Sequence, residues 1–144
     1  MVKGISMNDN IQLRMSLPKV PDIELVAIEG MERLAKHLGI TDEKIGEGRI
    51  LVNEAIINAL EHSGQQLPTV DVEFTMTKEK LTIFVRDYGT GFKPEDIEEP
   101  DIHKKLGSKS KRGWGLKLMK SMSDDFVIES GNDGTKITII KNLI

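Results

Sequence analysis

Residues 53–62 read N53-E-A-I-I-N-A-L-E-H62 and lie in the most apolar helical segment of the chain. In residues 50–60, eight of eleven side chains are apolar, and the other three are Asn53, Glu54 and Asn58. A helix this apolar is expected to be largely buried. Glu54 and Asn58 are one helical turn apart, so both are expected on the same side of this buried helix.

Two interpretations of Glu54 and Asn58 are open. In the first, both side chains line an enclosed site, because a buried carboxylate without a partner is costly. A metal ion, a water molecule or a ligand donor would offset that cost. In the second, both side chains lie at a solvated margin of the helix. For this pair taken alone, the solvated margin is slightly favoured.

The segments around this helix alternate between helical and strand periodicity. Helices are predicted over 22–38, 41–62 and 116–122, and strands over 11–16, 70–76, 81–85, 126–129 and 136–140. Separate strands and helices joined by hairpins favour an α+β two-layer sandwich, with a mixed, mostly antiparallel sheet and helices on one face. We expect residues 11–144 to form this single domain and residues 1–10 to be an N-terminal extension.

Composition narrows the classes of function. The 144-residue chain has a formal charge of -3 and a pI near 5.7, which argue against a nucleic-acid-binding surface over the whole domain. It has no cysteine, so disulfides and thiolate sites are excluded, and its three histidines lack metal-ligand spacing. No segment predicts a membrane span or a signal peptide, so we expect a cytoplasmic protein without a membrane partner.

A second group of candidate residues lies in the stretch L81-T-I-F-V-R-D-Y-G-T-G91. Strand alternation places Asp87 on the inward row, just before Gly89 and Gly91 allow a sharp turn. An inward carboxylate at a strand end is suited to accept a hydrogen bond from an amino group, such as that of a nucleobase. The simpler interpretation, an aspartate that caps its own turn, is favoured when this stretch is taken alone.

Two further stretches contain glycines at turns. K109-S-K-R-G-W-G-L116 ends a basic run and places Gly113 and Gly115 just before the predicted helix, where backbone N–H groups suit a phosphate. Trp114 is either a packing anchor or part of a moving lid. Gly134 and Thr135 precede the last strand, where a hydroxyl could reach the same pocket. A solvated basic loop and a plain hairpin turn are the alternatives.

The order of these motifs resembles that of the GHKL ATPase superfamily. The series is E54-x-x-x-N58, then D87-x-G-x-G91, then G113-x-G115, then G134-T135, and the resemblance covers nearly the whole chain from Asp22. Within that superfamily, the small size, the run at residues 53–62 and the R112-G-W-G-L-K-L-M segment are similar to the anti-sigma-factor serine/threonine kinases. The resemblance implies a Bergerat-type fold that binds ATP and Mg²⁺.

The resemblance also implies roles for individual residues. Asp87 would accept a hydrogen bond from the adenine amine, and Gly89 and Gly91 would leave room for the base. Asn58 would bind Mg²⁺, and Glu54 would be the catalytic base.

The remaining implied roles concern the phosphates and the adenine end. Thr135 would support the adenine, and Arg112 would meet the γ-phosphate as a catalytic charge. The segment that holds the phosphates would consist of Gly113, Trp114, Gly115 and Leu116.

Phosphoryl transfer depends mainly on positioning and charge neutralisation, so these groups would suffice. By resemblance, the phosphoacceptor is a Ser or Thr of a small antagonist protein, a sigma factor is an alternative partner, and the chain is a homodimer. The segment at residues 11–16 is expected as a dimer edge. The other function left open is a nucleotide-dependent protein-binding switch that transfers no phosphate.

Overall fold

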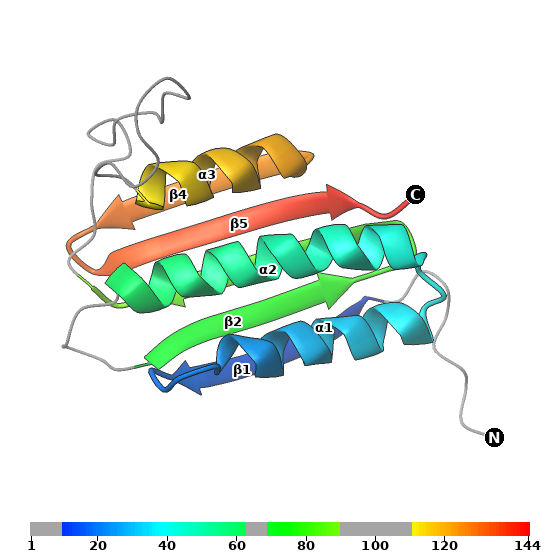
Figure 1. Cartoon of the computed structure of the whole chain (residues 1–144), viewed down its shortest axis with the longest axis horizontal. Helices are drawn as coiled ribbons and strands as arrows, with labels where there is room; N and C mark the ends of the chain where they lie inside the picture. The colour runs from blue at the N-terminus through cyan, green and yellow to red at the C-terminus, as the bar shows by residue number, and fades with distance from the viewer. Residues whose placement is uncertain (1–9, 63–68, 90–110) are drawn as a thin grey trace.

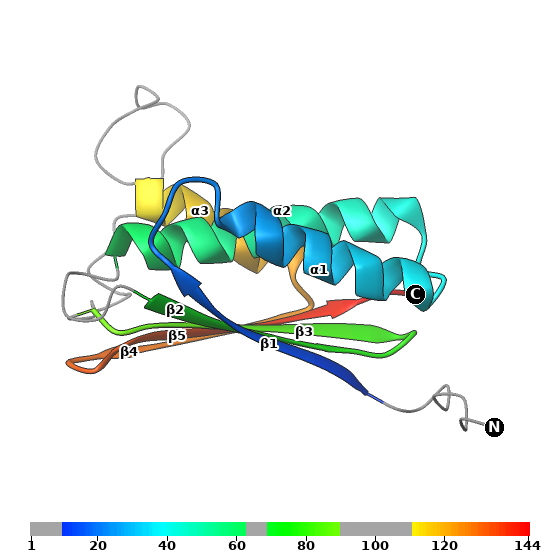
Figure 2. The same cartoon turned by 90° about the horizontal axis from the view of Figure 1, so that it is seen from below.

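The computed structural model describes residues 10–62, 69–89 and 111–144. In these residues three helices pack on one face of a five-stranded sheet, so the fold has two layers (Figure 1). The side view in Figure 2 shows the opposite face of the sheet uncovered by helices. The elements, in chain order, are β1 (Ile11–Pro18), α1 (Glu24–His37), α2 (Asp42–His62), β2 (Thr69–Met76), β3 (Lys80–Asp87), α3 (Lys111–Met122), β4 (Asp125–Gly131) and β5 (Gly134–Asn142).

The strands lie in the order β1-β2-β3-β5-β4. The predicted α+β sandwich with helices on one face is confirmed. Every strand pairing in the described part of the chain is antiparallel, so the parallel component expected of a mixed sheet does not occur there. The strands β1 and β4 form the two edges of the sheet, which gives β1 the edge position expected of it. The extension at residues 1–10 falls almost wholly outside the described residues.

The core lies between the sheet and the helices. Every second residue of β2 and β3 is buried, in agreement with the predicted alternation. On α2, Leu51, Val52, Ala55 and Ile56 are completely buried, which confirms that the apolar helix is largely enclosed. Full burial of an aliphatic side chain such as Leu51 contributes about 1.5–3 kcal/mol relative to exposure, so α2 and the sheet hold each other in place.

The third helix begins earlier than the sequence indicated. It starts at Lys111 rather than at residue 116, so Gly113 and Gly115 lie inside its first turns and not in a preceding loop. Glycine disfavours a helix by about 1 kcal/mol relative to alanine. Packing of α3 against α2 and β4 overrides that local preference.

The C-terminal end of α3 is held by Lys141 of β5. The Lys141 ammonium donates to the Met122 carbonyl oxygen at 2.8 Å and pairs with Glu47 of α2 at 3.0 Å. The hydrogen bond from Lys141 lowers the pKa of Glu47, and the charge of Lys44 adds to this effect. One cation therefore joins α2, the C-terminal end of α3 and β5.

Candidate functional site

Few polar side chains are buried in the described part of the domain. In residues 10–62, 69–89 and 111–144, the buried polar or charged residues are Asn58, Asp87 and Thr135, with 5%, 2% and 2% of their surface exposed. All three belong to the sequence motifs described above. They come from α2, β3 and β5, and Figure 1 shows that the end of α2, the beginning of α3, the end of β3 and the beginning of β5 lie at one end of the molecule.

Asp87 is the last residue of β3 and pairs with Thr135 of β5. Its Oδ1 accepts hydrogen bonds from the backbone N–H of Gly89 at 3.0 Å and from that of Thr135 at 3.2 Å. The carboxylate is therefore inward, as predicted, and it also caps its own turn at Gly89. The Asp87 carboxyl is thus buried and shared between the turn and β5. Its role as acceptor for an amino group stays a prediction.

Gly134 determines how closely β5 approaches Asp87. Its φ of 113° lies in the region that favours glycine, and a β-carbon there would overlap the Asp87 carbonyl oxygen. That β-carbon would also lie 2.9 Å from the Cα of Tyr88. The glycine before Thr135 therefore has a specific structural role, which a plain hairpin turn would not require.

The Thr135 side chain is directed toward β4. Its hydroxyl lies 2.7 Å from the Ser130 hydroxyl, within hydrogen-bonding distance. Ser130 belongs to none of the sequence motifs, and no local signal in the sequence identifies it. It is placed here because β4 and β5 pair with Ser130 opposite Thr135.

Asn58 and Glu54 have different environments on α2. The Asn58 Oδ1 is buried and has no hydrogen-bond partner in the structure. The solvated-margin interpretation is therefore wrong for Asn58, because packing against the sheet and α3 encloses this side of the helix. Glu54 is only partly buried.

The Glu54 carboxyl lies against the beginning of α3. A β-carbon on Gly115 would be 3.2 Å from Glu54 Oε2, so the absence of a side chain at residue 115 leaves space for this carboxyl group. Burial raises the pKa of Glu54, and the negative charge of Glu61 adds to the increase. The structure thus brings the first and third sequence motifs into contact.

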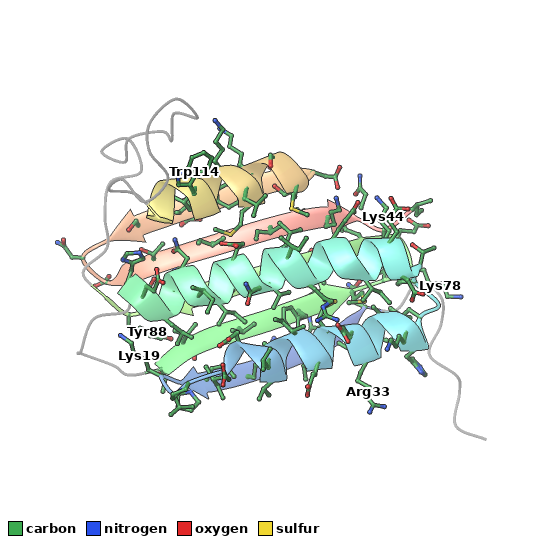
Figure 3. The ribbon with its side chains drawn as sticks, viewed as in Figure 1. Lys19, Arg33, Lys44, Lys78, Tyr88 and Trp114 are labelled. Carbon is green, nitrogen blue, oxygen red and sulfur yellow. The ribbon has the colours of Figure 1, made fainter. Side chains whose placement is uncertain are left out.

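The remaining predicted residues lie on α3 or outside the described residues. Leu116 packs against the hydrophobic core, and Trp114 is partly buried on the first turns of α3 (Figure 3). The side chain of Arg112 and residue Gly91 are outside the described part of the structure. Both remain sequence predictions.

Two hollows lie on the sheet face that the helices leave open. One of about 420 Å³ includes Arg14, Asp71, Glu73 and Arg86 in its lining, and one of about 240 Å³ lies between Arg86 and the β4–β5 hairpin. Neither lies between α2 and α3. Asn58, Asp87 and Thr135 line neither hollow, but the smaller one is bordered by Ser130 and Gly134, their neighbours on β4 and β5.

The residues that the structure describes contain no cluster of three or more His, Cys, Asp or Glu side chains suited to a metal ion. A Mg²⁺ ion held by one amide oxygen together with substrate phosphates and water does not need such a cluster. The buried Asn58 Oδ1, which has no hydrogen-bond partner, fits that kind of coordination. Among the described helices, none is long and apolar enough to cross a membrane.

Residues 21–141 match the family model described as the histidine kinase-like ATPase domain. The chain is 26% identical to the serine-protein kinase RsbW of Bacillus velezensis, over 91% of this chain and 85% of that protein. It is 29% identical to the serine-protein kinase RsbW of Listeria monocytogenes, over 83% of this chain and 79% of that protein.

The fold is similar to a crystal structure of the RsbU and RsbW domains of a Mycobacterium tuberculosis protein, with a TM-score of 0.69 and 16% identity. The match covers 92% of this chain but only 32% of that longer chain. At this identity the likeness concerns the fold alone.

Proposed function

Because the chain belongs to the histidine kinase-like ATPase domain family, we propose that it binds Mg-ATP and transfers the γ-phosphate to a Ser or Thr of a small antagonist protein. The observation that carries this proposal is the identity of the buried polar residues. Asn58, Asp87 and Thr135 come from three separate motifs, yet they are the polar residues buried in the described part of the chain. Burial of polar groups is costly, which favours a role in binding over a role in packing.

The adenine amine would donate a hydrogen bond to the Asp87 carboxylate. Two backbone N–H groups already hold Asp87 Oδ1, so the carboxyl plane is oriented before a ligand arrives. Thr135 would support the same end of the base, and Gly89 and Gly91 would leave space beside it. An acceptor that is held in advance favours a purine bearing an amino group at this position.

Asn58 Oδ1 would provide the protein ligand to Mg²⁺. The ion would supply charge neutralisation for the phosphates. The phosphates would lie near the beginning of α3, because the N-terminal end of a helix attracts anions. Arg112 and the segment containing Gly113, Trp114, Gly115 and Leu116 would contribute there.

Glu54 would be the general base. The substrate hydroxyl would give its proton to the Glu54 carboxylate as its oxygen bonds to the γ-phosphorus. The bond from that phosphorus to the bridging oxygen would break, leaving ADP. A carboxyl group whose pKa is raised by burial accepts a proton more readily near neutral pH than an ordinary glutamate does.

The partners belong to the same proposal. The relatives named serine-protein kinase support a Ser or Thr acceptor on another protein. By the resemblance to anti-sigma-factor kinases, a sigma factor would be the alternative partner, and β1, an edge strand, would pair in a cytoplasmic homodimer. A nucleotide-dependent binding switch without phosphotransfer is the other function that shares these nucleotide-binding residues.

Calorimetric titration with ATP and Mg²⁺ tests the nucleotide site. Saturable binding is expected for the wild type and should weaken at least about tenfold in Asp87→Asn, which removes the charged acceptor. Asp125→Asn, at an exposed aspartate of β4, is the matched control and should bind normally. A wild type that does not bind ATP would disprove the proposal.

Phosphotransfer separates the kinase from the binding switch. The γ-phosphate of labelled ATP should appear on a small antagonist protein with the wild type, and Glu54→Gln should abolish transfer while still binding ATP. Binding without transfer to any antagonist protein tested would favour the switch.

A further inference from the structure

The side chains of Tyr88, Asp71 and Arg86 form a cluster, and two of these residues, Arg86 and Tyr88, flank Asp87 in the sequence. The Tyr88 hydroxyl donates a hydrogen bond to Asp71 Oδ2, and the Arg86 guanidinium lies 4.7 Å from the centre of the Tyr88 ring. Asp71 and Arg86 are opposite each other on β2 and β3. Tyr88 is labelled in Figure 3, at the end of the molecule where β3 ends.

This cluster lies at the end of β3, where Asp87 is paired with β5 but no longer with β2. On the β5 side, Asp87 pairs with Thr135. On the β2 side, the register ends one residue earlier, at Asp71 and Arg86. The hydrogen bond from Tyr88 to Asp71 therefore extends the connection between β2 and the end of β3 beyond the last strand pair.

The peptide that joins Asp87 to Tyr88 is consequently held from both neighbouring strands. Gly134 of β5 packs against the Asp87 carbonyl and the Tyr88 Cα. The Tyr88 side chain links the same peptide to β2 through Asp71. The inward carboxylate and the outward ring belong to consecutive residues, so a rotation of the backbone at Tyr88 would move the Asp87 carboxyl group.

We propose that Tyr88, Asp71 and Arg86 are positioning residues that fix Asp87 for recognition of the purine amino group, an inference that rests on the proposed nucleotide site. A hydrogen bond discriminates between ligands only when its acceptor is held in place, because a mobile carboxylate adapts to other partners. In this role the three side chains act through Asp87 and not by contact with the nucleotide.

The charges around the cluster suit this role. The Tyr88 hydroxyl has an ordinary pKa of 10.0, which the bond to Asp71 raises further, so it is a donor throughout the physiological pH range. The Arg86 guanidinium faces the ring and stabilises it by a cation–π interaction. Arg86 also borders both hollows on the open face of the sheet.

The test compares the affinities for ATP and inosine triphosphate, which carries an oxygen in place of the amino group. Wild type, Tyr88→Phe, Asp71→Ala and the double variant are titrated with both nucleotides in Mg²⁺. In each single variant, we expect the preference for ATP to fall about five- to tenfold through weaker ATP binding, with inosine triphosphate affinity unchanged. The double variant should lose no more than the larger single loss, because both substitutions remove the same hydrogen bond.

Glu73→Ala is the matched control. Glu73 lies on the same face of β2, two residues from Asp71, and pairs with Arg14 at 3.1 Å. Its removal should leave the preference for ATP unchanged. Because Tyr88→Phe retains the ring, it should fold as the wild type does, and the midpoint of thermal unfolding is recorded for every variant.

Three outcomes would overturn the inference. An unchanged preference in Tyr88→Phe and Asp71→Ala would show that Asp87 needs no such support. A parallel loss of both affinities together with stability would assign the cluster to the fold alone. A wild type that does not bind ATP, or that binds both nucleotides equally, would disprove the nucleotide assignment itself and the inference with it.

Discussion

The carbonyl oxygen of Asp87 fills the space that a β-carbon on Gly134 would need. Gly134 has a φ of 113°, so the residue also has a backbone conformation that other residues rarely adopt. The close contact between β3 and β5 brings the Thr135 N–H to 3.2 Å from Asp87 Oδ1. The geometry around the buried carboxylate therefore depends on one residue without a side chain.

Gly134→Ala should destabilise the domain and displace Asp87. The steric overlap and the positive φ together should lower the free energy of unfolding by about 3 kcal/mol. Chemical denaturation measures this change. Gly131→Ala is the control, because Gly131 lies opposite Gly134 in the same hairpin and a β-carbon there meets nothing within 4 Å. Equal stability of the two variants would contradict the close approach.

Asn58→Leu should make the protein without nucleotide more stable while weakening Mg²⁺-dependent ATP binding. The substitution removes a buried oxygen that has no hydrogen-bond partner and keeps a similar volume, so a gain of about 1 kcal/mol is expected. Denaturant unfolding and calorimetric titration measure the two effects. Asn53→Leu, at a partly buried residue of the same helix, should change neither property greatly. A less stable Asn58→Leu would show that the oxygen is satisfied in solution.

Glu54→Gln should change how stability depends on pH. Because the folded protein raises the pKa of Glu54 above its ordinary value of 4.5, wild-type stability should fall as the pH rises from 4.5 through the folded value. The side chain of the glutamine variant does not ionise, so the variant does not lose stability in this way. It should therefore be at least as stable as the wild type at pH 7. Thermal unfolding across this pH range measures the difference.

Glu61→Gln serves as the comparison for Glu54→Gln. It removes the charge that is the second cause of the raised pKa but leaves the burial of Glu54 in place. An intermediate pH dependence is expected. If Glu54→Gln were less stable than the wild type at pH 7, the carboxylate would have a stabilising partner and the raised pKa would be wrong.

The contact between Glu47 and Lys141 should stabilise the domain in a pH-dependent way. A double-mutant cycle with Glu47→Gln and Lys141→Met should give a coupling of about 1 kcal/mol at pH 7. Because the pKa of Glu47 is lowered, this stability is present above 4.5 and is lost as the pH falls through the folded value. Lys44→Met should couple more weakly, since its contact with Glu47 is longer at 3.5 Å. Coupling that persists in acid would contradict the assignment.

The sequence predicted the elements in which buried residues recur at a regular spacing along the chain. The buried face of α2 and the alternation of β2 and β3 follow from spacings of three to four residues and of two residues. Asp87 was predicted to be inward for the same reason. The start of α3 was predicted too late, because Gly113 and Gly115 lower local helix propensity while contacts with α2 favour the helix.

By itself, then, the sequence determined the fold class, the extensive burial of α2 and the inward direction of Asp87. These depend on the periodicity of neighbouring residues, which a linear pattern contains. Only the tertiary structure decided that Gly134 packs on Asp87, that Gly115 makes room for Glu54 and that Tyr88 reaches Asp71. Each of these contacts depends on strand register or on helix packing between segments that are distant in the sequence. The spacing of residues within one segment specifies neither the register nor the packing.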